Sequence, residues 1–187
     1  MRERSKDLRV RRTLTAVRKA FNELVLARDY REISITDLTE RAGINRKTFY
    51  LHYTSLDDLV EEIEEEVAND LLEHIGKYAV SLDLTGCITY FYKYLESCSK
   101  VQKKLMCDEG YSFFYNAVTD RVLSSDEFSK FFSQTEYPSV VRSYTKAITS
   151  IYKDWIDNGR DIDFKVLTEL ASKLLENGYS GVIGSKR

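Results

Sequence analysis

Proline is nearly absent from this chain and glycine is scarce: the 187 residues hold 1 Pro and 8 Gly. Sandwiches and barrels of many short strands need frequent Gly and Pro turns, so this composition excludes them. No apolar run approaches the ~20 residues that a membrane-spanning helix needs. Hydrophobic residues make up 43% of the sequence, which is enough for a core. We therefore predict an all-α fold built from long helices.

Cysteine and histidine are also sparse, with 3 Cys and 2 His. The cysteines are widely spaced and form no C-x-x-C pair: Cys87, Cys98 and Cys107. Their odd number and wide spacing argue against a disulfide framework and are typical of a protein in a reducing cytosol. No metal-ligand spacing, Gly-rich phosphate loop or nucleophile elbow occurs. We expect no metal, no cofactor and no catalysis. The basic start has no apolar segment after it, so we expect a cytoplasmic protein that does not bind a membrane.

The formal net charge of −2 hides an uneven distribution. Residues 1–55 carry 13 Lys and Arg against 7 Asp and Glu, whereas residues 56–75 carry 9 acidic residues and no Lys or Arg. A basic head attracts polyanions, and an acidic connector beside it limits how a polyanion can lie. The alternative, that the Glu run at 61–66 is only the solvated face of a helix, stays open.

Apolar residues recur at three- and four-residue steps along the whole chain, which indicates amphipathic helices. The predicted helices cover residues 10–28, 36–42, 46–53, 56–75, 82–99, 100–107, 111–132, 138–158 and 163–177. We expect a break near Ser124 and Ser125. Pro138 is expected at the first position of its helix. Gly159 and Gly178 are expected to end the last two helices.

Two short predicted helices separated by a glycine turn form the sequence motif that indicates a function. Gly43 suits the left-handed end of the first helix, and Asn45 is a good N-cap for the second. The candidate capping pairs of the first helix are Ser34 with Asp37 and Thr36 with Thr39. This is the helix-turn-helix pattern. Phe49 and Tyr53 of the second helix face inward, and its outward side chains are Arg46, Lys47, Thr48 and Tyr50.

These outward side chains are of the types that contact DNA. Arg and Lys suit guanine edges or phosphate, Thr suits a thymine methyl or phosphate, and a Tyr hydroxyl reaches phosphate. We therefore predict an N-terminal three-helix DNA-binding module over residues 1–55. The remaining residues, 56–187, are predicted to form a helical-bundle domain.

The stretch ISITDLTERAGINRKTFYLHYTSLDDLV resembles the N-terminal module of TetR-type bacterial transcriptional regulators. The shared features are an apolar–Thr–x–x–Leu start, Ala-Gly-Ile, Thr-Phe-Tyr, and His-Tyr before a Leu-containing fourth helix. The specific resemblance covers residues 10–60. The remainder agrees in length, in its helical pattern and in the Trp155-Ile156-x-x-Gly159 ending of the penultimate helix.

The resemblance implies roles for individual residues. Thr36 contacts phosphate, and the second helix of the motif faces the major groove. The residues implied to contact DNA are Thr36, Arg46, Lys47, Thr48, Tyr50, Tyr53, Arg11 and Arg12. The last two belong to a basic arm, with Arg2, Arg4 and Arg9, that would add phosphate or minor-groove contacts. A solvated tail is the alternative for this arm, and His52 is expected to be structural.

The sequence departs from the family pattern at two positions. Thr39 stands where the helix before the turn often has Ala, and it is small enough to fit. The family commonly has a Lys near the start of the fourth helix, where it grips phosphate. Leu56 stands there in this chain, followed by Asp57 and Asp58. One phosphate contact is therefore expected to be missing, which flattens the salt dependence of DNA binding by about one unit.

The resemblance also implies that the larger domain dimerises through its last two helices. Two-fold pairing places the recognition helices about one DNA turn apart, ~34–36 Å, so the expected partner is a short palindromic double-stranded operator. An effector pocket for a small apolar or aromatic molecule is implied in the same domain. Its candidate lining residues are Tyr90, Phe91, Tyr94, Phe113, Phe114 and Trp155. The alternative is that these aromatic residues only fill the core.

Two functions follow from these observations. The first is a homodimeric one-component transcriptional regulator whose affinity for its operator changes when an effector binds. Repression is the family's usual mode, and no residue distinguishes it from activation. The second is an interaction protein of the same fold that binds DNA weakly and acts through a protein partner. Leu56 and the acidic connector motivate this alternative.

Overall fold

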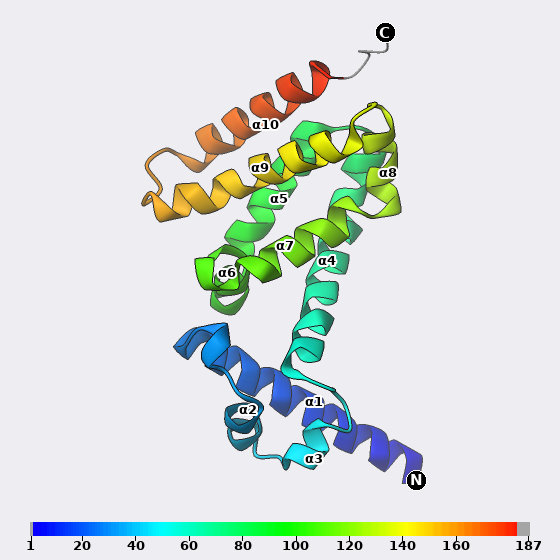
Figure 1. Ribbon diagram of the computed structural model, residues 1–187, viewed down its shortest axis with the longest axis vertical. Helices are drawn as coiled ribbons and strands as arrows, with labels where there is room; N and C mark the ends of the chain where they lie inside the picture. Colours follow the sequence, from blue (N-terminus) through cyan, green and yellow to red (C-terminus); the bar gives the residue numbers. More distant parts are fainter. Residues whose placement is uncertain (1, 183–187) are drawn as a thin grey trace. The chain divides into compact units, whose positions relative to one another are not determined.

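The computed structural model describes residues 2–182, and the side chains of residues 8–182, as helices joined by short turns (Figure 1). No strand occurs among these residues, so the all-α prediction is confirmed. The elements are α1 (Arg2–Ala27), η1 (Tyr30–Glu32), α2 (Ile35–Ala42), α3 (Arg46–Phe49), α4 (Leu56–Val80), α5 (Leu84–Ser97), α6 (Lys100–Cys107), η2 (Glu109–Tyr111), α7 (Ser112–Leu123), α8 (Asp126–Ser133), α9 (Pro138–Asp157) and α10 (Phe164–Ser180).

The helices form two compact units, which we call the head and the body. The head comprises the residues up to Glu64 together with Ser99–Phe114, and it therefore contains α1, α2, α3, α6 and η2. The body comprises Glu65–Cys98 together with the described residues from Tyr115 onward. The head is thus built from two segments that are far apart in the sequence.

The first helix is longer than its apolar pattern predicts. The prediction placed its start near residue 10, but α1 begins at Arg2. Residues 2–9 contain neither Gly nor Pro, so nothing in them stops the helix from continuing past the last apolar contact. The basic arm is therefore part of α1 and not a tail. The side chains of Arg2 and Arg4 lie outside the described residues.

Two predicted helix ends are wrong because the glycines concerned serve packing. The helix predicted to end at residue 75 continues through Gly76 to Val80, and the helix predicted to end at Gly178 continues to Ser180. A Cβ atom at Gly76 would lie 3.0 Å from Cγ of Glu127, and one at Gly178 would lie 2.5 Å from the ring of Tyr144. Close approach of neighbouring helices explains both glycines better than capping does.

Other boundaries agree with the sequence pattern. The expected break lies between α7 and α8, which are separated by Ser124 and Ser125. Pro138 is the first residue of α9. Gly159 follows the C-cap of α9 with a φ of 75°, a left-handed conformation that favours glycine.

Tyrosine hydroxyls join the helices of the body. Tyr92 donates to the carbonyl oxygen of Ile148 at 2.7 Å, and Tyr179 donates to that of Phe131 at 2.7 Å. Tyr115 donates to the hydroxyl of Thr149 at 2.7 Å. Each of these tyrosines is buried, so these three side chains belong to the core and their hydroxyls are satisfied inside it.

Within residues 2–182, no helix combines the length and the hydrophobicity required to traverse a lipid bilayer.

Candidate nucleic-acid interface

The start of α2 is fixed by a capping box. The Ser34 hydroxyl accepts the backbone N–H of Asp37 at 3.1 Å, and the Asp37 carboxylate accepts the backbone N–H of Ser34 at 3.1 Å. Of the two candidate capping pairs, the structure selects this one. The hydroxyl of Thr39 instead donates to the carbonyl oxygens of Ile35 and Thr36 inside the helix. The pKa of Asp37 is lowered by its hydrogen bonds from Ser34 and by nearby Arg28.

The turn between α2 and α3 has the predicted geometry. Gly43 is the C-cap of α2, with φ 65° and ψ 33°. Asn45 is the N-cap of α3, and its side chain accepts the backbone N–H of Lys47 at 2.9 Å. The motif therefore forms as expected from two local signals, a left-handed glycine and an asparagine cap.

The second helix of the motif is shorter than predicted. Residues 46–53 were expected to be helical, but α3 ends at Phe49. The N–H of Tyr50 still bonds to Arg46, but those of Leu51 and His52 bond three residues back, to Thr48 and Phe49, at 3.3 and 2.9 Å. This tighter winding ends the helix before the chain turns into α4.

Most of the residues implied to contact DNA lie on the surface of the motif. Arg46, Lys47 and Thr36 are exposed, and Tyr50 is 49% exposed. Thr48 is half-buried. On the opposite side of α3, the side chain of Phe49 is fully buried. The separation of a polar outer face from an apolar inner face is what a groove-reading helix requires.

Tyr53 supports the motif from inside. It is 4% exposed, and its ring lies 5.5 Å from that of Phe49. Its hydroxyl donates to the carboxylate of Glu62 at 3.2 Å, and Arg18 also pairs with this carboxylate at 2.8 Å. Tyr53 therefore ties the end of the motif to α1 and α4. His52 is half-buried beside it.

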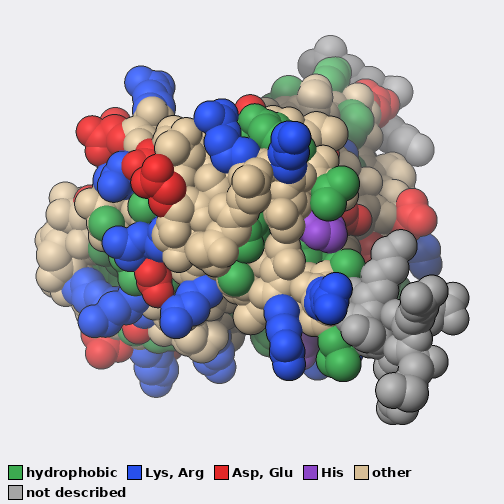
Figure 2. All heavy atoms as spheres, turned by 90° about the horizontal axis from the view of Figure 1, so that it is seen from below, with side chains coloured by type: hydrophobic (Ala, Val, Ile, Leu, Met, Phe, Trp, Pro, Cys, Tyr) green, Lys and Arg blue, Asp and Glu red, His purple; other side chains and the backbone are tan. Residues whose placement is uncertain are grey.

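Basic residues of α1 add to the cationic surface of the head. Arg9, Arg11 and Arg12 belong to α1, and all three side chains are exposed. Figure 2 views the molecule from below, and Lys and Arg side chains are prominent on this face. Exposed arginines are of the residue type that contacts phosphates, the contacts that dominate DNA affinity.

The acidic residues after Leu56 have structural partners in the head. The Tyr30 hydroxyl donates to the carboxylate of Asp57. The Asp58 carboxylate accepts the backbone N–H of Thr54 at 2.7 Å, which caps the start of α4. Burial and the bond to Asp57 raise the pKa of Tyr30, which keeps this phenol protonated. Helix capping and packing therefore explain why Asp57 and Asp58 stand in the first turn of α4.

Leu51 was missed by the sequence analysis. It follows α3 and is 79% exposed, the highest exposure among the large apolar side chains described. The available signal was its position between the inward-facing Phe49 and Tyr53, which places it on the outer side. An exposed apolar side chain is of the type that contacts the methyl group of thymine in protein–DNA complexes.

A second segment of the chain completes the head. The hydroxyl of Tyr111, in η2, donates to the carbonyl oxygen of Arg28 at the end of α1 at 3.1 Å. Burial, together with the charges of Asp29 and Asp108, raises the pKa of Tyr111 to about 12. The phenol therefore remains a hydrogen-bond donor at any physiological pH. Nothing in the local sequence predicts this contact, because the two residues are 83 positions apart.

The body contains an apolar cavity of about 40 Å³. Its lining includes Ile75, Cys87, Phe91, Val122, Phe131 and Leu175. The polar groups around it are three threonines whose hydroxyls donate to carbonyl oxygens of their own helices: Thr119, Thr145 and Thr149. Burial raises the pKa of the Cys87 thiol to about 12, so no charge is present there.

Of the six aromatic residues suggested as a pocket lining, one, Phe91, lines the body cavity. Tyr90 stacks on His74, Trp155 donates its indole N–H to the carbonyl oxygen of Ile162, and Phe114 is fully buried. The remaining two, Tyr94 and Phe113, belong to different units, the body and the head.

Comparison with known proteins agrees with this geometry. Residues 19–63 match the family model described as bacterial regulatory proteins, tetR family. An uncharacterized HTH-type transcriptional regulator of Bacillus subtilis, YxbF, is 33% identical over 75 residues, which are 40% of this chain and 20% of that protein. DhaS of Lactococcus lactis, a transcriptional activator of the dhaKLM operon, is 25% identical over 170 residues, which are 87% of this chain and 89% of that protein.

A solved structure extends the likeness to the whole fold. The structure of NalD, the secondary repressor of the MexAB-OprM multidrug efflux pump in Pseudomonas aeruginosa, aligns over 95% of this chain and 99% of its own with a TM-score of 0.59. The identity is 17%, so this likeness shows the fold alone. The fold and the motif define a regulator with a DNA-binding helix-turn-helix. Within this fold, residues 19–63 resemble the helix-turn-helix segment of TetR-type bacterial regulatory proteins.

Proposed function

We propose that this regulator binds a palindromic operator as a homodimer and that a small apolar effector in the body changes its affinity for DNA. The observation that carries the proposal is the exposed outer face of α3, with Arg46 and Lys47 next to the Asn45 cap. Arg46 and Lys47 are of the residue types that contact guanine edges and phosphates in the major groove. Thr36 in the first turn of α2 is exposed and is proposed to bind phosphate.

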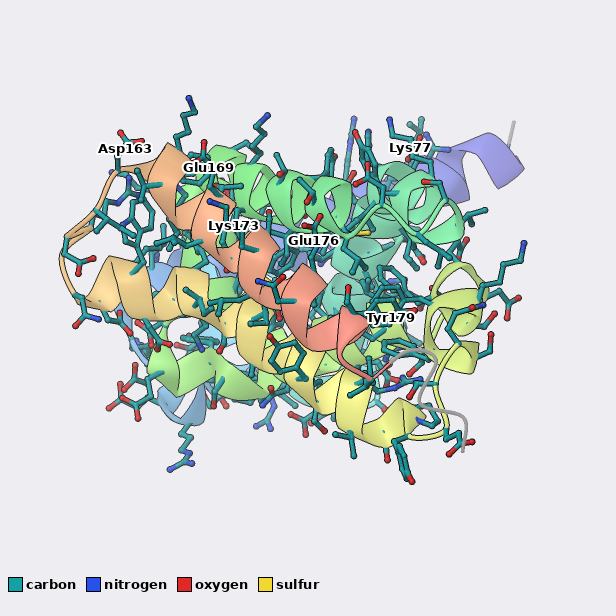
Figure 3. The ribbon with its side chains drawn as sticks, turned by 90° about the horizontal axis from the view of Figure 1, so that it is seen from above. Lys77, Asp163, Glu169, Lys173, Glu176 and Tyr179 are labelled. Atoms are coloured by element: carbon teal, nitrogen blue, oxygen red, sulfur yellow. The ribbon has the colours of Figure 1, made fainter. Side chains whose placement is uncertain are left out.

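An exposed apolar stripe on α10 supports dimerisation. Val166, Leu170 and Leu174 are spaced by four residues, so they share one face, and they are 44–50% exposed. Val140 on the adjacent α9 is 61% exposed. Figure 3 shows α10 from above, with the charged Glu169 and Lys173 along it. An apolar strip bordered by charge is the pattern of a protein interface.

This interface makes a clear prediction for the oligomeric state. Leu170→Glu should convert the dimer to monomers in size-exclusion chromatography with light scattering, because it places two charges in an apolar contact across a two-fold axis. Leu26→Glu, at a side chain of similar exposure on α1, is the matched control and should leave the dimer intact. A dimer that survives Leu170→Glu would contradict the assignment.

The effector is proposed to enter the apolar cavity of the body. At about 40 Å³ the cavity is smaller than the ~150 Å³ site that holds benzene in an engineered protein, so binding must widen it. The threonine hydroxyls already donate to backbone carbonyls, which leaves only acceptor lone pairs for a ligand. The cavity therefore suits a neutral, largely apolar molecule. Widening of the body on binding is the proposed source of the change in DNA affinity.

Repression is the proposed mode of action, although the similar proteins differ. The neighbour in fold is named as a repressor, whereas the relative that matches over most of its length is named as an activator. An operator that overlaps the promoter would support repression, and one upstream of it would support activation. In vitro transcription with purified polymerase distinguishes the two.

The first experiment is fluorescence anisotropy with DNA from the upstream region of the gene, at several salt concentrations and with random DNA as competitor. Arg46→Glu combined with Lys47→Glu should abolish specific binding and preserve the dimer. The matched control is Lys93→Glu with Lys130→Glu, which reverses two exposed charges of the body. Binding that survives reversal on α3 would overturn the groove assignment. Wild-type binding no better than to random DNA, with and without candidate effectors, would favour the interaction-protein alternative.

A further inference from the structure

The head contains a cleft that the proposed function does not use. It has a volume of about 520 Å³ and lies between η1 and η2. Both elements belong to the head, and none of the residues that line the cleft lines the body cavity. Small-molecule sites commonly have volumes of ~300–1,000 Å³, so the cleft is large enough for a ligand.

One wall of the cleft is aromatic. The rings of Tyr30 and Phe113 have centroids 4.8 Å apart and are inclined at 47°. Phe113 is 39% exposed, so part of its ring is open to an occupant. The Tyr30 ring is held in place by its hydroxyl bond to Asp57 and by edge-to-face contact with Tyr111 at 6.4 Å. The wall is therefore a fixed aromatic surface and not a mobile side chain.

The rim of the cleft is predominantly negative. Asp29, directly before η1, and Glu109 of η2 line it, and both residues are exposed. Arg31 is the opposing charge among the lining residues, which leaves one net negative charge. A Cβ atom at Gly110 would lie 3.3 Å from Oδ1 of Asp29, so the glycine gives this carboxylate room beside the η2 backbone.

We propose that this cleft binds a small organic cation, a quaternary or protonated amine on a flat apolar body. Aromatic ring faces attract such cations, and carboxylates at the rim supply the opposite charge. A small anion would face two carboxylates. A bare metal ion would meet aromatic walls that offer it few oxygen ligands. The proposal is independent of the effector cavity, which is apolar and lies in the body.

Such a ligand would contact two parts of the head at once. Two residues separate η1 from α2, the first helix of the motif, and η2 leads into α7. An occupant that touches Tyr30 and Phe113 together would add to the contacts that join these segments, and it would do so without entering the body.

The test uses the full-length protein and benzyltrimethylammonium chloride. Isothermal titration should show saturable binding, and the backbone amide signal of Gly110 should shift in two-dimensional NMR spectra. Neopentylbenzene, in which carbon replaces the quaternary nitrogen, should bind about tenfold more weakly because it lacks the charge. Asp29→Asn combined with Glu109→Gln should weaken binding of the cation by about the same factor.

Matched variants separate the cleft from general charge effects. Glu136→Gln combined with Asp161→Asn removes two exposed carboxylates of the body and should leave binding unchanged. Phe113→Leu keeps an apolar side chain but removes the ring face, and it should weaken binding of the cation several-fold. Because Asp29 makes no side-chain capping bond to η1, its amide variant is expected to fold, which thermal unfolding checks.

Several results would overturn the proposal. One is the absence of saturable binding at millimolar concentrations of the cation. Another is equal binding of the cation and its neutral isostere. A third is unchanged affinity in the folded Asp29 and Glu109 double variant, or NMR shifts confined to the body. None of these results depends on DNA binding, so they leave the proposed function of the regulator unaffected.

Discussion

The ring of Tyr144 on α9 lies directly against Gly178 on α10, where a Cβ atom would come within 2.5 Å of three atoms of the phenol. The hydroxyl of Tyr144 also donates to the carbonyl oxygen of Leu174, one turn earlier on α10. The two helices are therefore joined by one tyrosine at a position that only glycine leaves open. This contact holds together the pair of helices on which dimerisation is proposed.

Gly178→Ala should destabilise the protein, although alanine is the better helix former by about 1 kcal/mol. The new methyl group must displace the ring of Tyr144, and overpacking of this kind costs about 1–3 kcal/mol. Urea unfolding measures the change. Gly181→Ala is the control, because its Cβ would meet its nearest neighbour at an ordinary 3.5 Å. Equal stability of the two variants would show that Tyr144 moves aside freely.

Acidification should remove the contribution of Asp37 to the stability of the head. Its pKa is lowered in the folded state by the hydrogen bonds from Ser34 and by Arg28. The stabilisation is therefore complete above the ordinary carboxyl pKa of about 3.9 and is lost as the pH falls through the lowered folded value. Thermal unfolding of the wild type and Asp37→Asn, measured from about pH 6 downward, should converge at the acid end.

The control for this pH dependence is Asp161→Asn, at an exposed carboxylate between α9 and α10. Its difference from the wild type should stay constant over the same range. A difference at Asp37 that also stays constant would mean that the capping box does not depend on the charge of the carboxylate.

Leu56→Lys should restore the phosphate contact that the family commonly has. The logarithm of the DNA association constant should then fall more steeply with the logarithm of salt concentration, by about one unit of slope. Anisotropy titrations at four or more salt concentrations measure it. Val80→Lys adds the same charge at the other end of α4 and should leave the slope unchanged. An unchanged slope in Leu56→Lys would place the start of α4 away from the DNA backbone.

Cys87 should resist thiol reagents. Burial raises the pKa of its thiol to about 12, so almost no thiolate exists at about pH 8. Mass spectrometry after brief treatment with iodoacetamide should find Cys87 unmodified and label at Cys98 or Cys107, which are only half-buried. Rapid labelling of Cys87 in the native protein would indicate that the body cavity opens readily without an effector.

The sequence predicts the helix-turn-helix well because its signals are local. The Ser34 and Asp37 pair, the left-handed Gly43 and the Asn45 cap each act within a few residues, and all three appear in the structure as expected. Phe49 and Tyr53 are buried as their spacing predicts.

Several of the failed predictions concern residues whose partners are distant in sequence. Glycine is typical of a helix end, but Gly178 lies inside α10, where the lack of a side chain leaves room for the ring of Tyr144. Tyr111 and Arg28 meet across 83 positions, so no local pattern could assign η2 to the head. The aromatic residues proposed as one pocket instead line a cavity, fill the core or line the cleft of the head. Hydrophobic periodicity predicts which face of a helix is buried, but it does not predict which other element packs against that face.

The assignment of Ser99–Phe114 to the head has a consequence for protein engineering. A chimaera that exchanges DNA-reading domains at a point in α4 would transplant α1–α3 and leave α6 and η2 behind. The grafted part would lose the hydroxyl of Tyr111 that bonds Arg28, and the recipient would keep a segment without its counterpart. A graft that respects the fold carries both segments, with junctions at Glu64 and on either side of 99–114.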